Sequence, residues 1–328
     1  MARISVGVIG AGKHGQRYLQ HLREDIPELS LAAFSRRDSV AGAALARSLG
    51  VAFHADWHDL VADPAIEAVV AVVPPTLHPS IAAAVGAARK PLLIEKPLAA
   101  TGATARDVAR SIRASGVACL MAHTLRWNTV VRAVRDRLPE LGPLRALHLN
   151  QRFEPSSLGW IDDPAVSGGG IILHTGVHSF DLVRWLTGRE VVRVSCRVLR
   201  ADTRRTEDNF VAILELDGGA PLVTVSGSRS TAGRSGLIDI AGARGQLVGD
   251  HALGFAYGVR GLERSPLVLP GMVPTVREAL GAFARLLVAG EPPPVSVDDG
   301  ARAVLIADAC RASAEAGEPR PVPPLEGV

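Results

Sequence analysis

The chain has 328 residues, of which 47% are hydrophobic and 21% charged, and its net charge at pH 7 is +3. This length predicts two domains, and the hydrophobic fraction is enough for sizeable cores. The charged fraction argues against a disordered protein. No basic run with interleaved aromatic residues points to nucleic acid, and no apolar run approaches the roughly 18 residues of a membrane span. The three cysteines are widely spaced, as reduced thiols would be, so we expect a cytoplasmic protein without a signal peptide.

The first predicted element is a β-branched strand at residues 4–9, which leads into GAGKHG at residues 10–15 and then a helical pattern. A strand, a GxGxxG turn and a helix together form the dinucleotide-binding fingerprint. The first glycine permits the tight turn, the second lets the backbone approach the pyrophosphate, and the third brings helix and strand together. The amides at the helix start then face the phosphates. The predicted cofactor contacts here are Gly10, Gly12, Lys13, His14 and Gly15.

The second predicted strand, residues 31–34, ends where the fingerprint expects an acidic residue for the ribose 2′-hydroxyl. This chain has Ser35, Arg36 and Arg37 there. A carboxylate would repel a 2′-phosphate, whereas serine and the arginine fork donate hydrogen bonds to it. We therefore expect NADP(H) to be favoured, with NAD(H) possible. The alternative is two solvated arginines in a surface loop.

Strands and helices continue to alternate as far as residue 123. Residues 68–73 and 92–95 are apolar runs typical of buried parallel strands. Ligands of open α/β sheets bind beyond the carboxyl ends of the strands, where Lys96 follows the second run. These features predict a Rossmann domain with a doubly wound parallel sheet over residues 1–123.

After residue 123 the pattern changes to α+β. A helix and a long strand precede the segment 168–188, which we expect to be a buried helix closed by Gly188. Four strands and two closing helices follow. The pattern predicts a substrate-binding and oligomerisation domain over residues 124–328, with an open, mostly antiparallel sheet and a C-terminal helix able to pack back on the first domain.

His174, His178 and Asp181 share one face of the helix expected at residues 168–188. Their spacings of four and three residues stack the three side chains. Because the rest of the segment is nearly all apolar, this polar face is expected to line a cavity. The spacing also suits zinc, but a catalytic histidine explains it without a metal and no cysteine is near, so we expect none.

Several motifs, in this order, resemble the Gfo/Idh/MocA oxidoreductases. They are GAGKHG at 10–15, PPTLH at 74–78, EKP at 95–97, GGGxxxxxGVHxxD at 168–181 and GEPPPVSVDDGARAV at 290–304. The resemblance covers essentially the whole chain and implies a Rossmann domain paired with an open-sheet domain. It implies hydride transfer between nicotinamide and a carbinol or ketone carbon of a sugar, cyclitol or similar substrate. It also implies a homodimer or homotetramer formed through the exposed face of the second sheet.

By the same resemblance, Lys96 lies beside the nicotinamide and hydrogen-bonds the reacting oxygen, while His178 exchanges the hydroxyl proton. Hydride leaves carbon only as its oxygen loses a proton, and a base with a pKa near neutrality serves best. A neighbouring ammonium stabilises the developing alkoxide. Both residues would then meet substrate between the two domains. The resemblance further implies cofactor contacts at Pro74, Pro75, Thr76, His78, Glu95 and Lys96.

His174 departs from the family pattern, which usually has aspartate there. It either shares the proton transfer as a third catalytic residue or binds another substrate feature, such as an anionic group. The departure also leaves open a non-catalytic sensor similar to the family's corepressors. Asp181 either orients His178 or makes a structural hydrogen bond. The candidate substrate contacts are Arg126, Trp127, Arg152, Trp160 and Asp181.

Overall fold

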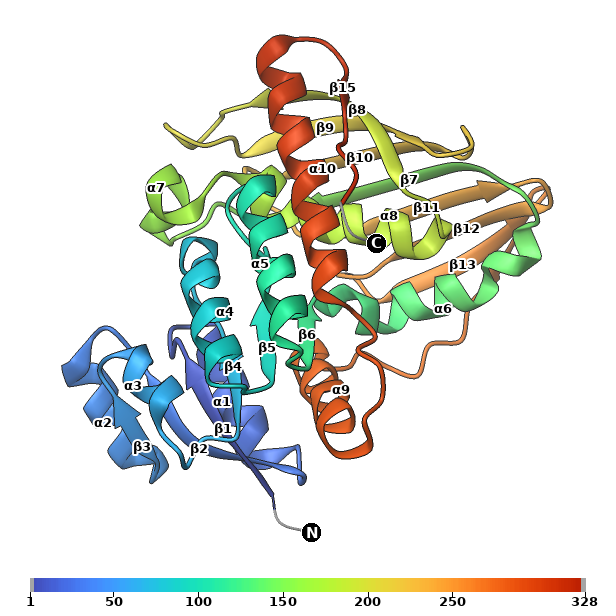
Figure 1. Ribbon diagram of the computed structural model, residues 1–328. Coiled ribbons are helices and arrows are strands. Elements are labelled where there is room, and N and C mark those ends of the chain that lie inside the picture. The colour runs from blue at the N-terminus through green and yellow to red at the C-terminus, as the bar shows by residue number, and fades with distance from the viewer. Residues whose placement is uncertain (1–2, 326–328) are drawn as a thin grey trace. The chain divides into compact units, whose positions relative to one another are not determined.

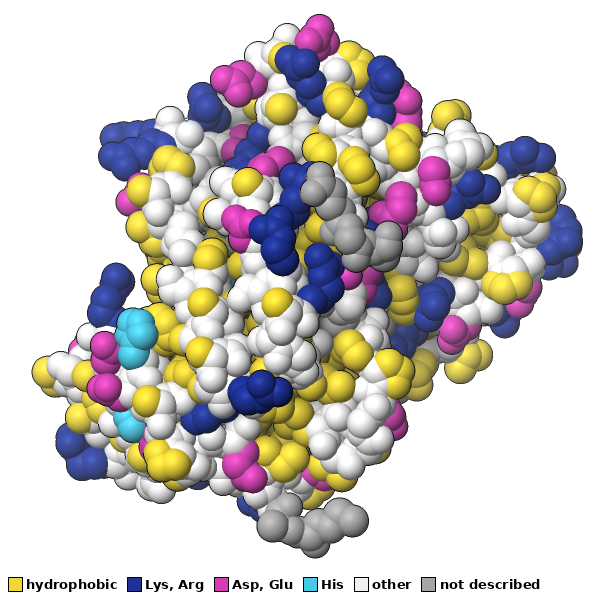
Figure 2. All heavy atoms as spheres, in the orientation of Figure 1, with side chains coloured by type: hydrophobic (Ala, Val, Ile, Leu, Met, Phe, Trp, Pro, Cys, Tyr) yellow, Lys and Arg dark blue, Asp and Glu magenta, His cyan; other side chains and the backbone are white. Residues whose placement is uncertain are grey.

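The structure is a computed structural model that describes residues 3–325 (Figure 1). The chain divides into two compact units. The first comprises Met1–Ala99, Ala103–Thr124 and Pro274–Ala301, and the second Ala100–Gly102, Leu125–Val273 and Arg302–Val328. Among the described residues, no helix combines the length and apolar character needed to cross a membrane. On the face seen in Figure 2, acidic and basic side chains are interspersed with apolar ones.

A six-stranded parallel sheet forms the centre of the first unit, with strand order β3-β2-β1-β4-β5-β6. The order reverses between β1 and β4, which is the switch point where open α/β sheets bind their ligands. This arrangement confirms the predicted doubly wound sheet. The strands are β1 (Ile4–Ile9), β2 (Leu29–Ser35), β3 (Ala52–His54), β4 (Ala68–Ala71), β5 (Leu92–Glu95) and β6 (Cys119–Ala122).

Helix α2 of this unit begins and ends at residues suited to those positions. Asp38 caps α2, because its Oδ1 accepts a hydrogen bond from the Ala41 amide at 3.0 Å, and Gly50 closes the helix at φ +68°. Helix α9 comes from the far end of the chain and packs on α1. The helices are α1 (Gly15–Glu24), α2 (Ser39–Leu49), α3 (Trp57–Ala62), α4 (His78–Ala87), α5 (Gly102–Ser115) and α9 (Thr275–Ala289).

The second unit is built on a nine-stranded sheet in the order β14-β13-β12-β11-β7-β10-β9-β8-β15. Strands β7 and β10 pair in parallel, and the other neighbours pair antiparallel. The prediction of an open, mostly antiparallel sheet is confirmed. The strands are β7 (Leu144–Arg152), β8 (Val191–Leu199), β9 (Asn209–Leu216), β10 (Leu222–Ser228), β11 (Leu237–Gly242), β12 (Gly245–Asp250), β13 (Phe255–Arg260), β14 (Glu263–Pro266) and β15 (Arg320–Pro321).

Helices cover one face of this second sheet (Figure 1). Side chains along β9 alternate between buried and exposed, so Phe210 packs inward against Phe180 while Val211 and Ile213 are 49% and 56% exposed on the outer face. The helices that pack on the inner side include α6 (Thr129–Arg137), α8 (Val177–Thr187) and α10 (Val297–Ala316).

The segment 168–188 is not one α-helix as predicted. Residues Ile172–Gly176 form a π-helix that leads into α8, which ends at Gly188 with φ +66°. Glu207 binds the start of this segment, because its carbonyl oxygen accepts from the Ile171 amide at 2.8 Å. Its carboxylate accepts from the Ile172 amide at 3.1 Å. The helical start is thus held by a loop distant in sequence, a constraint that periodicity does not reveal.

Candidate active site

The glycine-rich loop has the shape that a dinucleotide requires. Gly10 has φ +98°, and a Cβ there would clash with the Val72 carbonyl oxygen, while a Cβ on Gly15 would clash with the Gly10 carbonyl. A Cβ on Gly12 would meet no protein atom within 4 Å. The space over Gly12 therefore faces outward beside the first amides of α1, where a pyrophosphate fits.

The end of β2 lies against this loop. The Gly10 amide donates to the Ser35 carbonyl at 3.0 Å, and the Ser35 side chain is buried. Arg36 is half-buried and Arg37 is exposed. The guanidinium groups, rather than the serine hydroxyl, are therefore accessible to a ligand, and the Asp38 carboxylate is engaged as the cap of α2.

Glu95, at the end of β5, joins the glycine-rich loop to the segment that carries Lys96. Its Oε1 accepts from His14 Nε2 at 2.7 Å and from the Tyr18 hydroxyl at 2.6 Å. Its Oε2 accepts from the Lys96 amide at 3.0 Å. Burial alone would raise the pKa of Glu95, but the charge and hydrogen bond of His14, with Lys96 and Tyr18, lower it to about 2. The carboxylate is thus a buried anion, and its predicted cofactor contact stays a prediction.

The segment after β4 contributes residues of different accessibility. Pro75 is buried at the start of the 3₁₀ helix Pro75–Leu77, Pro74 is half-buried and Thr76 is exposed. His78 is fully buried, and its Nδ1 lies 3.1 Å from the Leu98 carbonyl oxygen. His78 thus packs against the segment that follows Lys96, and its predicted cofactor contact stays a prediction.

Burial gives His78 a measurable effect on acid stability. Desolvation lowers the pKa of His78 from 6.5 to about 4. Because the unfolded chain takes up this proton first, folded-state stability falls as pH drops from about 6.5 to about 4, by roughly 3 kcal/mol. We expect His78→Asn, which keeps a donor near the Nδ1 position but does not titrate, to flatten this part of a urea-unfolding pH series. An unchanged slope would contradict this origin.

Lys96 follows β5 directly and is half-buried, and the Lys96–Pro97 peptide bond is cis. Lys96 lies at the carboxyl edge of the parallel sheet, where β5 is the neighbour of β4. Lys96 therefore follows the carboxyl end of a buried parallel strand, as predicted, and its contacts with cofactor and substrate stay predictions.

In the second unit, His178 and His174 differ in environment. His178 is half-buried in the first turn of α8. His174 lies in the π-helix, is only 8% exposed, and its Nε2 lies 2.9 Å from the Ser167 carbonyl oxygen. The ring of Trp160 meets the His174 ring edge-on, with centroids 5.6 Å apart.

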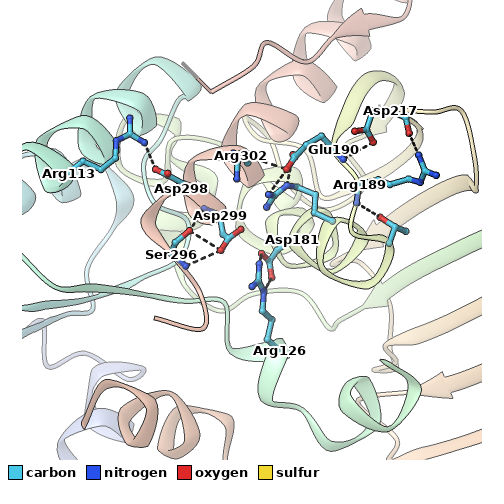
Figure 3. A network of polar contacts seen from close by, with 12 residues as sticks. Arg113, Arg126, Asp181, Arg189, Glu190, Asp217, Ser296, Asp298, Asp299 and Arg302 are labelled. Atoms are coloured by element: carbon cyan, nitrogen blue, oxygen red, sulfur yellow. Dashed lines mark hydrogen bonds and ion pairs between the residues drawn. The ribbon is translucent and has the colours of Figure 1, made fainter. Parts of the chain in front are cut away.

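Asp181 forms a buried ion pair with Arg126 (Figure 3). Arg126 Nε donates to Oδ2 at 2.8 Å and Nη2 to Oδ1 at 2.6 Å, the bidentate geometry typical of arginine and carboxylate. Trp127 beside it is buried. Of the two roles left open for Asp181, the observed contact is the structural one, and the substrate contacts of Arg126, Trp127 and Asp181 stay predictions.

Arg152 points away from α8. Its neighbour Gln151 faces α8 and donates to Ser179 Oγ at 2.8 Å. Successive side chains in a strand point to opposite faces, and Arg152 Nη2 accordingly donates to Ser226 Oγ at 3.1 Å in a shallow groove on the outer face. Arg152 thus lies on the opposite face of the sheet from α8, and its contact with substrate stays a prediction. Sequence reasoning missed Gln151, for which no motif provides a signal.

Two family descriptions match the chain. "Oxidoreductase family, NAD-binding Rossmann fold" matches residues 4–123, and "GFO/IDH/MocA C-terminal domain" matches residues 131–248. The chain belongs to the Gfo/Idh/MocA oxidoreductase family. It is therefore an enzyme that uses a nicotinamide cofactor and acts on CH–OH groups.

Relatives of this Gfo/Idh/MocA enzyme extend over nearly its full length. Inositol 2-dehydrogenase 1 of Saccharopolyspora erythraea is 30% identical, with 96% of this chain and 95% of that protein covered. Myo-inositol 2-dehydrogenase of Thermotoga maritima is 27% identical, with 94% and 96% covered. The crystal structure of an oxidoreductase domain protein from Kribbella flavida shares the fold, with a TM-score of 0.89 at 22% identity over 99% of this chain and 100% of that one. These dehydrogenases lend no support to the sensor alternative.

Proposed function

We propose that this Gfo/Idh/MocA enzyme oxidises a secondary alcohol of a cyclitol or similar polyol, or reduces the corresponding ketone. The observation that carries the proposal is the 30% identity, over nearly the whole of both chains, to an inositol 2-dehydrogenase. The glycine-rich loop with its open space over Gly12 supports the nicotinamide dinucleotide as the redox partner.

Lys96 and His178 are the proposed chemical residues. The nicotinamide cofactor, when bound, takes or supplies the hydride. His178 removes the hydroxyl proton as the alcohol is oxidised, and its partial exposure lets it exchange that proton with solvent. The Lys96 ammonium stabilises the oxygen as negative charge develops. His178 removes the proton but does not stabilise the negative oxygen, and Lys96 stabilises the oxygen but does not remove the proton. Both residues are therefore required.

Arg36 and Arg37 support a preference for NADP(H). Both lie at the carboxyl end of β2, where an NAD-specific fold would place an acid for the ribose. The nearest carboxylate, Asp38, is committed to the Ala41 amide at 3.0 Å. A 2′-phosphate would meet the accessible guanidinium groups of Arg36 and Arg37, while the Asp38 carboxylate is held at the start of α2.

The direct test is the initial rate of NAD(P)H formation at 340 nm with myo-inositol, other inositols and aldoses. We expect turnover with a cyclitol, and a kcat/KM for NADP⁺ about tenfold or more above that for NAD⁺, the effect of one charge-assisted hydrogen bond. Arg36→Ala should remove that preference, whereas Arg260→Ala, at the exposed last residue of β13, should not. Turnover with NAD⁺ alone overturns the cofactor proposal only. No turnover with any polyol overturns the function.

The outer face of the second sheet is apolar enough to be covered by another chain. Val211 and Ile213 are 49% and 56% exposed there, and Leu222 at the start of β10 is 72% exposed. The homodimer or homotetramer implied by the family resemblance stays a prediction.

A further inference from the structure

His174 is held as a hydrogen-bond donor. Its Nε2 lies 2.9 Å from the Ser167 carbonyl oxygen. A carbonyl oxygen only accepts hydrogen bonds, so Nε2 carries the hydrogen in this contact. The imidazole is only 8% exposed. One ring nitrogen is thus already committed to the backbone of the segment that precedes the π-helix.

The residues from Gly159 to Ser167, which we call the Trp160 segment, are fixed at two points. Near one end, Asp162 accepts from the amides of Arg205 and Thr206, each at 2.9 Å. At the other end, Ser167 accepts from His174, and the Trp160 ring lies edge-on to the same imidazole at 5.6 Å. His174 therefore contacts both the backbone and the indole of this segment.

The bend after the segment brings Ser167 back to the π-helix. Gly168 has φ +73°, and a Cβ at this position would clash with Ala100. The Ser167 side chain is fully buried. The burial of Ser167 and the close contact of Gly168 with Ala100 therefore restrict the backbone on both sides of the Ser167 carbonyl, which His174 contacts.

We propose that His174 is a positioning residue that holds the Trp160 segment against the π-helix, and that the 36%-exposed indole of Trp160 thereby forms a wall of the polyol site. The inference rests on the proposed function for its substrate. An aspartate at position 174 cannot replace this histidine, because an ionised carboxylate does not donate and would oppose the Ser167 carbonyl. The C–H face of a polyol ring then packs on the indole, so Trp160 sets substrate affinity.

Glutamine separates positioning from proton transfer. Its amide nitrogen reaches the place of a histidine Nε2 and donates, but it does not titrate. We expect His174→Gln to keep kcat within about threefold of wild type with an unchanged pH profile. His174→Asp and Trp160→Ala should raise KM about tenfold, with less effect on kcat, and combining His174→Ala with Trp160→Ala should add little.

Hydrogen exchange tests the contact without any substrate. We expect amides of residues 159–167 to exchange about fivefold faster in His174→Ala and at the wild-type rate in His174→Gln. Ser265→Ala, at an exposed position on β14, is the control. Unchanged exchange in His174→Ala overturns the positioning role whatever the substrate is. A folded His174→Gln protein whose kcat falls a hundredfold would show that the imidazole transfers protons. An unchanged KM in Trp160→Ala would show that the indole does not line the polyol site.

Discussion

Replacing Lys96 with methionine is expected to lower kcat by about a thousandfold. Methionine keeps much of the length of the side chain but cannot donate to the reacting oxygen or balance its charge, and loss of one such donor costs about a hundred- to a thousandfold. Glu95 still accepts from the backbone amide at position 96, which is independent of the side chain, so the strand end should keep its place. The measurement is single-turnover oxidation of the polyol, followed at 340 nm.

The matched control for this variant is Lys90→Met. The Lys90 ammonium donates to the Asp63 carbonyl at 2.6 Å, before the amino ends of β5 and β4 and away from their carboxyl ends, and its loss should leave kcat unchanged. Fluorescence titration with NADPH should give Lys96→Met a cofactor affinity within a few-fold of wild type. Near-wild-type turnover in Lys96→Met would rule out its assigned role.

Removing Asp181 is expected to destabilise the protein by about 3–5 kcal/mol. Its side chain is 1% exposed and that of Arg126 8%, so Asp181→Ala takes a buried, bidentate carboxylate away from the guanidinium. The Arg126 guanidinium lies 5.7 Å from the Trp185 ring centroid, a contact that replaces little of the lost pair. The measurement is the free energy of unfolding from urea titration.

Two comparisons separate the effect of the buried Arg126 charge from the effect of losing a side chain or an exposed ion pair. The double variant Arg126→Met with Asp181→Leu should be less destabilised than Asp181→Ala, because it removes both buried charges. Glu154→Ala breaks the exposed pair with Arg234, whose side chains are 47% and 60% exposed, and should change the free energy of unfolding little, because solvent screens an exposed pair. A cost for Asp181→Ala as small as that of Glu154→Ala would show that the Arg126 pair adds no stability.

Local signals predicted the first unit well. The loop at residues 10–15 has the turn glycines in the order that the dinucleotide fold requires, and Asp38 and Gly50 bound their helix as a cap and a left-handed terminator. The strand Ala52–His54 was missed because three residues are too few to show a period. Strand β12 was missed because the turn at Ala243–Arg244 lacks the Asn-Gly or Asp-Gly signal of a short hairpin.

The site was harder to predict because its contacts join distant residues. Asp181 meets Arg126 across 55 positions, which helical spacing from His178 does not indicate. His174 was expected to face a cavity with His178, but its Nε2 contacts Ser167. The π-helix that places this ring differs from an α-helix by its hydrogen bonding and hardly by composition.

The two edge strands of the nine-stranded sheet are poorly suited to pairing with a strand of another chain. Strand β14 has four residues and ends at Pro266, and β15 has two residues and ends at Pro321. A terminal strand this short, with a proline that lacks an amide hydrogen, offers few backbone groups to a neighbouring strand. Lengthening of this sheet by pairing with another strand at β14 or β15, the step by which open-ended fibrils grow, is thus disfavoured.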